Sequence, residues 1–185
     1  VYMTLQESNE IGWFSLSSPP NVLQDKVAFT NPEHEPDGIW VNEAGTLICT
    51  AGEYDGTIGV HTLNASGKPS TQLFIRLADD LPSNWDWDDK RKGIEPEEVV
   101  IAEAGGKSFV LTTLQDAGAV VVYDITDPTN PKYDSGAITE LNDYTTQTDG
   151  ESQGEPEGLA FKNGYVLVSN GDDPSVALLK SSWAK

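Results

Sequence analysis

The segment Glu35–Val41, which reads EPDGIWV, decides the fold of this chain because its pattern occurs three times. Sixty residues later Glu95–Ile101 reads EPEEVVI, and after a further sixty Glu155–Phe161 reads EPEGLAF. Each copy joins a Glu-Pro-acid motif to a short apolar run of the kind that forms a β-strand. A fixed period of this length is the signature of a repeat architecture, in which each repeat is one structural unit.

More short apolar runs follow each motif, and turns containing Gly or Asn separate them. Second strands are expected at 47–50, 108–111 and 165–168, third strands at 57–60, 119–123 and 176–179, and a fourth at 72–76 with a weaker counterpart at 132–133. Groups of four strands repeated around an axis are propeller blades, so the sequence predicts an all-β, β-propeller-type repeat of four-stranded antiparallel blades. A β-sandwich is the alternative, and it would not place the Glu-Pro strands side by side around an axis.

The N-terminal segment matches the middle of a repeat rather than its beginning. Thr4–Glu7 resembles Thr113–Asp116, and Ile11–Leu16 resembles Val120–Ile125. We therefore expect about three and a half blades, in repeats at approximately 1–30 (partial), 35–80, 95–140 and 155–185. Because open sheet edges pair with other strands, the end blades should contact another copy, a partner chain or the remainder of a longer propeller.

The composition is strongly acidic. Thirty acidic and 11 basic residues give a formal charge of −19, which disfavours nucleic acid and anionic membrane surfaces as partners. The charge suits cation binding, although solubility alone would also explain it. The sequence lacks the long apolar run that a membrane span needs. Cys49 is a lone cysteine, predicted to be a buried apolar residue.

The Glu-Pro motifs supply candidate metal ligands. The start of a blade's first strand lies at one mouth of the propeller channel, and residues two apart point to the same side of an extended segment. Clustered carboxylates repel one another, and a hard cation such as Ca²⁺ relieves that repulsion. The predicted metal ligands are Glu35, Asp37, Glu95, Glu97, Glu155 and Glu157.

A structural role for these glutamates is the competing interpretation. Each could accept hydrogen bonds from backbone amides of the neighbouring blade and fix the spacing between blades. His34 precedes the first motif and could join a site at the mouth, but it is expected to be a solvated loop residue, whereas His61 is expected to be structural. Two polar inserts, at 79–93 and 142–154, are predicted to crowd the same face as the motifs.

Several of these stretches together resemble the choice-of-anchor I domain family, which includes mesenchyme-specific cell-surface glycoproteins and alkaline phosphatase-like bacterial proteins. The matching stretches are Thr4–Asn9, Pro36–Ile39, Asp88–Lys90 with Gly93–Glu97, Val122–Pro128 and Glu155–Phe161. The resemblance implies a secreted or cell-surface β-propeller with a cation at the Glu-Pro positions. Glu98 departs from the family pattern, which has Gly at that place.

Function is constrained by what the sequence lacks. A Gly-x-Ser-x-Gly nucleophile motif is absent, and no catalytic residue can be assigned. The leading hypothesis is a non-catalytic scaffold or binding module with an acidic, cation-binding mouth. The alternative is a calcium-dependent phosphoesterase of the alkaline phosphatase or phytase type, in which the metal would bind phosphate and activate water.

Overall fold

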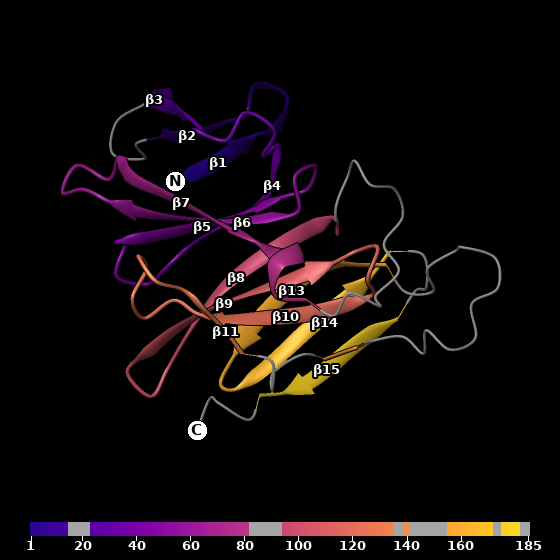
Figure 1. Cartoon of the computed structure of the whole chain (residues 1–185). Helices are drawn as coiled ribbons and strands as arrows, with labels where there is room; N and C mark the ends of the chain where they lie inside the picture. Colours follow the sequence, from indigo (N-terminus) through magenta and orange to yellow (C-terminus); the bar gives the residue numbers. More distant parts are fainter. Residues whose placement is uncertain (15–22, 82–93, 135–138, 141–154, 172–174, 182–185) are drawn as a thin grey trace.

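The computed structural model describes residues 1–14, 23–81, 94–134, 139–140, 155–171 and 175–181. This part of the chain is all-β, and its helical elements are two single turns, η1 (Gln6–Ser8) and η2 (Leu77–Asp79). The strands form four antiparallel sheets that follow one another along the sequence (Figure 1). Most of the two inserts, at 82–93 and 141–154, lies outside the described residues.

The two middle sheets have the strand order expected of complete blades. The second sheet runs in the order β4 (Pro36–Val41), β5 (Leu47–Gly52), β6 (Thr57–Leu63) and β7 (Pro69–Arg76). The third sheet contains β8 (Pro96–Ala104), β9 (Lys107–Leu114) and β10 (Ala119–Asp124), followed by the short strands β11 (Lys132–Tyr133) and β12 (Thr139–Glu140). Both short strands pair with β10, at opposite ends, so the fourth strand of this sheet is interrupted.

The end sheets have three strands each in the described part of the chain. The first sheet consists of β1 (Tyr2–Leu5), β2 (Glu10–Phe14) and β3 (Leu23–Ala28), and the fourth of β13 (Pro156–Lys162), β14 (Tyr165–Asn170) and β15 (Val176–Lys180). Thr4 pairs with Ile11 just as Thr113 pairs with Val120 in the third sheet. This register is the one expected if β1 and β2 correspond to the second and third strands of a blade.

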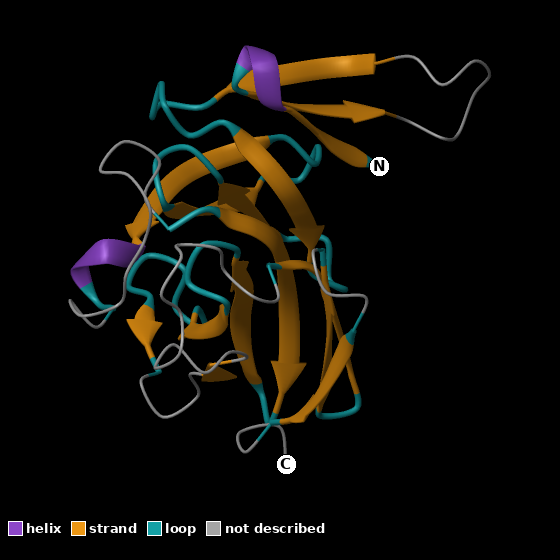
Figure 2. Cartoon of the chain, turned by 90° about the vertical axis from the view of Figure 1, so that its right-hand side faces the viewer, coloured by secondary structure: helices purple, strands orange, loops and turns teal. Residues whose placement is uncertain are grey.

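The four sheets stand in a row, and each packs on the next. β4 contacts β8, and β8 contacts β13, so the strands that begin with Glu-Pro lie side by side. A separate hydrophobic core fills each of the three junctions between successive sheets. Figure 2 shows the first sheet and the N-terminus at one end of this row. This arrangement is that of propeller blades rather than of a two-sheet sandwich.

The largest core lies between the second and third sheets. Cys49, Ile58 and Val60 from one sheet meet Val99, Val110 and Val121 from the other, and all are buried. β9 and β10 are apolar on both faces because each face contacts a neighbouring sheet. Strands covered on both faces lose the alternation of polar and apolar residues, as this sequence does.

Candidate functional site

Each Glu-Pro motif is fixed by the same backbone contact within its own sheet. The carbonyl of the glutamate accepts a hydrogen bond from the first residue after the second strand. These pairs are Glu53 N to Glu35 O (3.4 Å), Gln115 N to Glu95 O (2.9 Å) and Gly171 N to Glu155 O (2.7 Å). The recurring contact therefore uses the glutamate backbone, and the side chain is left to other interactions.

A β-bulge follows the proline in all three motifs. The pairing register shifts between Pro36 and Ile39, between Pro96 and Val99, and between Pro156 and Gly158. Bulges place extra residues in one strand and redirect their side chains. Here the acidic residue after each proline lies within the bulge, at the same end of each sheet as the glutamate.

Neighbouring sheets bring some of these acidic side chains together. Glu97 shares a hydrogen bond with Asp37 of the preceding sheet, and Glu53 and Glu95 add negative charge around the pair. Partial burial of Glu97, followed by the hydrogen bond and charge of Asp37, raises its pKa to about 8. The pair therefore holds a proton near neutral pH, a state in which two carboxyl groups tolerate close approach.

Gln115 lies among the carboxylates of the third and fourth sheets. In one orientation of its amide, Nε2 lies 3.3 Å from Glu155 Oε2. In the other orientation the nitrogen donates to Glu97 at 3.0 Å and to Glu95 at 3.3 Å. Gln6 occupies the same position in the first sheet and donates from Nε2 to Glu53 Oε2 at 2.5 Å. Glutamines in these turns thus link carboxylates across the junctions between sheets.

The structure brings together part of the predicted ligand set. Asp37, Glu95 and Glu97 converge at the junction of the second and third sheets, and Glu155 contacts Gln115 in one orientation of its amide. Glu35 and Glu157 are exposed, as is Asp37. The backbone carbonyls of Asp37 and Glu157 each accept a hydrogen bond from a threonine of the preceding sheet, Thr4 at 2.8 Å and Thr113 at 3.3 Å. These threonine contacts link the first sheet to the second and the third sheet to the fourth.

Sequence reasoning missed two members of this cluster, Glu53 and Gln115. Both are the first residue after a second strand, the position that Gln6 also occupies. Aligning that position across the repeats would have identified them as neighbours of the Glu-Pro carbonyls. We call Asp37, Glu53, Glu95, Glu97 and Gln115 the mouth cluster.

The mouth cluster offers oxygen ligands but does not form a complete coordination sphere. Carboxylate and carboxamide oxygens are the donors that Ca²⁺ prefers. Among the described residues, no group of three or more His, Cys, Asp or Glu side chains is arranged to hold one metal ion. The donor chemistry therefore fits calcium, whereas the geometry offers the Asp37–Glu97 pair and not a set of three ligands.

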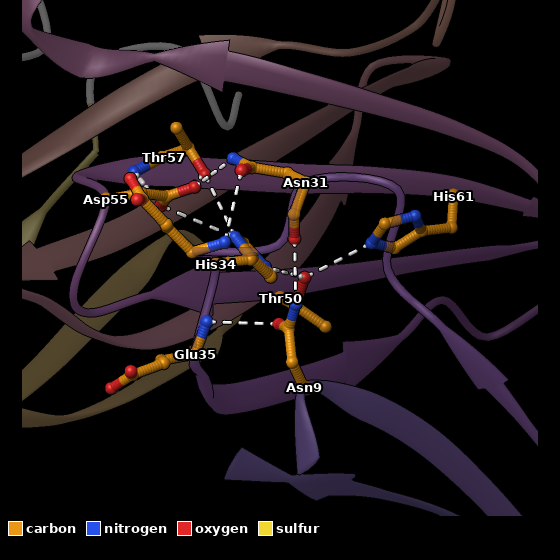
Figure 3. Close-up of polar contacts among 9 residues, drawn as sticks. Asn9, Asn31, His34, Glu35, Thr50, Asp55, Thr57 and His61 are labelled. Carbon is orange, nitrogen blue, oxygen red and sulfur yellow. Dashed lines mark hydrogen bonds and ion pairs between the residues drawn. The ribbon is translucent and has the colours of Figure 1, made fainter. Parts of the chain in front are cut away.

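A buried polar network lies behind the first motif (Figure 3). His34 contacts Thr57 Oγ1 at 2.9 Å through Nδ1 and Thr50 Oγ1 at 2.8 Å through Nε2. Asp55 Oδ1 lies 3.5 Å from His34 Nδ1, and Thr50 also contacts His61 Nε2 at 3.1 Å. The prediction that His34 is a solvated loop residue is wrong, since its side chain is 0% exposed.

Two glycines make room for the histidines. A Cβ on Gly52 would collide with the His34 ring, and one on Gly59 would lie 2.5 Å from His61 Nε2. Phe29 and Phe74 pack around both rings. Burial, and then the proximity of His34, lowers the pKa of His61 to about 3, so this ring stays neutral. The network is inaccessible and has the character of a structural element.

The network also places the first motif. Asn31 in the same loop donates to Asp55, and Asn9 of the first sheet donates to the Asn31 carbonyl at 2.8 Å. The Glu35 backbone N–H in turn donates to Asn9 Oδ1 at 3.1 Å. Glu35 has a φ of 43°, a left-handed conformation that a non-glycine residue adopts only when its surroundings hold it.

Two solved structures share this fold. The chain is similar to a streptogramin B lyase, with 19% identity over 91% of this chain and 44% of that one and a TM-score of 0.55. It is also similar to a 6-phosphogluconolactonase-like protein from Bacteroides uniformis, with 16% identity over 97% and 51% and a TM-score of 0.56. The fold is a β-propeller type. The chain spans about half the length of either neighbour.

Sequence comparisons add no family assignment. No protein-family model matches the chain, and no curated protein matches it. The resemblance to the choice-of-anchor I family stays a prediction. In the described part of the chain, no helix has the length and apolar character needed to cross a membrane.

Proposed function

We propose that this chain is a non-catalytic, secreted or cell-surface propeller module whose mouth cluster binds a divalent cation, with Ca²⁺ the expected ion. The observation that carries the proposal is the hydrogen-bonded contact between Asp37 and Glu97 across two sheets, with Glu53 and Glu95 close by. The two carboxyl groups repel one another when both are ionised, and a bound cation would relieve that repulsion in place of the shared proton.

The Asp37–Glu97 pair predicts the coordination and the affinity of the proposed site. Two carboxylates from different sheets would supply part of the six to eight oxygens that Ca²⁺ takes, and water would supply the rest. Such a site is weak, with an expected dissociation constant of about 10⁻⁴–10⁻³ M, typical of extracellular calcium modules. Because Asp37 and Glu97 belong to different blades, the bound ion would tie the second sheet to the third.

Calorimetric titration of Ca²⁺ tests the proposal. The Glu97→Gln variant should bind at least about tenfold more weakly, because it loses one charged ligand. Glu43→Gln is the matched control, since Glu43 is an exposed acid in the turn between β4 and β5, at the opposite end of β4 from Asp37. Equal affinities for wild type and Glu97→Gln would contradict the proposal.

One observation keeps the phosphoesterase as a second candidate. A carboxyl group with a pKa near 8 can exchange a proton at neutral pH, which is the property of a general acid or base. Hydrolysis of p-nitrophenyl phosphate with added Ca²⁺ separates the candidates. Calcium-dependent turnover that Glu97→Gln abolishes and Glu43→Gln retains would replace the non-catalytic assignment.

A further inference from the structure

The turn between β6 and β7 carries a sequence motif that the proposed cation site does not use. Asn64, Ala65 and Ser66 form the Asn-x-Ser pattern, with x not proline, at which N-linked glycans are attached. No other Asn-x-Ser or Asn-x-Thr pattern without proline at x occurs in the sequence. Because so short a motif also arises by chance, the structural setting of the asparagine has to carry the inference.

The motif lies at the tip of a hairpin, and all three of its residues are exposed. Gly67 N donates to Asn64 O at 2.8 Å and Asn64 N donates to Lys68 O at 3.0 Å, so backbone hydrogen bonds close the tip. Thr57, at the start of β6, pairs with Gly52 beside the mouth cluster, which puts the motif at the opposite end of the strand. A glycan there would leave the mouth cluster open.

The hydrogen bonds of the Asn64 side chain involve only its oxygen. Oδ1 accepts from Ser66 N at 2.9 Å, from Ser66 Oγ at 2.6 Å and from Lys68 N at 3.0 Å. Nδ2, the atom to which a glycan bonds, makes no hydrogen bond within the described part of the chain. A sugar on Nδ2 therefore displaces no hydrogen bond of the folded chain.

Asn42, in the turn between β4 and β5, has the opposite arrangement. It is 8% exposed, and its Nδ2 donates to Thr46 Oγ1 at 3.2 Å and to Glu103 Oε1 of the third sheet at 3.3 Å. A glycan on this nitrogen would disrupt both contacts. Because Glu43 and Ala44 follow Asn42, a single substitution of Ala44 by serine creates the motif at this buried asparagine.

We propose that Asn64 is the acceptor of an N-linked glycan. The donor is an oligosaccharide joined to a lipid diphosphate. Asn64 Nδ2 forms a bond to the anomeric carbon of the first sugar, the bond from that carbon to the diphosphate oxygen breaks, and one amide proton is released. The Ser66 hydroxyl is the group by which the transferring enzyme recognises the site. The inference rests on the secreted or cell-surface location in the proposed function.

Secretion of the chain from cultured insect cells, followed by peptide mass spectrometry, tests the proposal. A secretion signal supplied in the experiment fixes the location, so a missing glycan would reflect the site itself. Wild type should carry N-acetylhexosamine and hexose on Asn64, and Ser66→Thr should be modified at least as completely. Asn64→Gln and Ser66→Ala should be unmodified. An unmodified wild type would overturn the proposal, and so would a glycan that Asn64→Gln retains.

The variant Asn64→Gln/Ala44→Ser moves the motif to Asn42 and is the matched control for the structural argument. A glycan on Asn42 should lower both secretion and thermal stability relative to Asn64→Gln. Enzymatic removal of the glycan from wild type should shift the unfolding midpoint by less than about 2 °C. Equal secretion and stability with a glycan on Asn42 would contradict the argument.

Calcium titration of the same samples separates this proposal from the cation site. The motif and the mouth cluster lie at opposite ends of the second sheet, so glycosylated and deglycosylated wild type should bind Ca²⁺ with equal affinity. A glycan on Asn64 without any calcium binding would overturn the cation site and support the acceptor site. Calcium binding by a chain that carries no glycan would do the reverse.

Discussion

His61 shows how a single buried side chain makes stability depend on pH. Its Nδ1 is buried without a hydrogen-bond partner in the described structure, and its pKa is lowered from 6.5 to about 3. A proton that binds the unfolded chain more tightly than the folded chain favours unfolding. The contribution of His61 is therefore complete above pH 6.5 and is lost as the pH falls toward 3.

We predict that the free energy of unfolding decreases between pH 6.5 and pH 4 with a His61 component of up to about 1.4 kcal/mol per pH unit. The His61→Phe variant keeps an aromatic ring among Phe29 and Phe74 but cannot titrate, so its slope in this window should be smaller. Urea unfolding at several pH values measures both slopes. Parallel slopes would show that the ring does not remain neutral in the folded state.

The titration of Glu97 changes the stability in the opposite direction with pH. Its folded pKa of about 8 lies above the ordinary value of 4.5, so the folded chain binds its proton more tightly and loses stability as the pH rises from 4.5 to 8. In chelator-treated buffer, Glu97→Gln should match wild type near pH 5 and be more stable at pH 9. The expected gain is about 1–2 kcal/mol, after allowance for solvent screening of this half-buried group. The exposed Glu43→Gln control should show no such difference between the two pH values.

At the scale of the element, whether a glycine in the bulge of a first strand can be replaced by a larger residue depends on which atoms face it. A Cβ on Gly38 would lie 2.5 Å from the Glu97 backbone carbonyl, whereas a Cβ on Gly158 would meet the Ser169 hydroxyl at 2.4 Å. A carbonyl held by neighbouring strands cannot move aside, but a hydroxyl can rotate away. Gly38 and Gly158 occupy equivalent positions but should therefore differ in how well they tolerate an added side chain.

We predict that Gly38→Ala costs about 2 kcal/mol or more and that Gly158→Ala costs clearly less. Chemical denaturation of the two variants gives the comparison directly. Similar costs would mean that the bulge itself requires glycine and that the neighbouring sheet is not the cause. Glu98 at the equivalent place in the third sheet already shows that the bulge accepts a side chain.

Strands were the most predictable elements. The sequence predicted strands at 39–41, 99–101 and 159–161, and the structure extends each back to the proline because pairing resumes there after the bulge. The site was less predictable. His34, in the loop before β4, is buried because Gly52 at the end of β5 leaves space for its ring. Glu53 and Gln115 lie near Glu97 because packing between sheets brings their turns there, and such placement depends on contacts between distant segments.

At the scale of the whole molecule, a formal charge of −19 makes acidic side chains repel one another across the compact structure. Added salt screens this repulsion. The free energy of unfolding should therefore increase with ionic strength, which urea unfolding at several salt concentrations measures.

The serial packing of the sheets has a consequence for how the molecule comes apart. Each core is shared between two successive sheets, so the stability of each sheet is coupled only to that of its neighbours in the row. The sheets then behave as a one-dimensional chain of coupled units. A middle sheet is held by two couplings and an end sheet by one. Fraying should begin at the first and fourth sheets and move inward, and the amides of β9 and β10 should be the last to exchange their hydrogens with solvent.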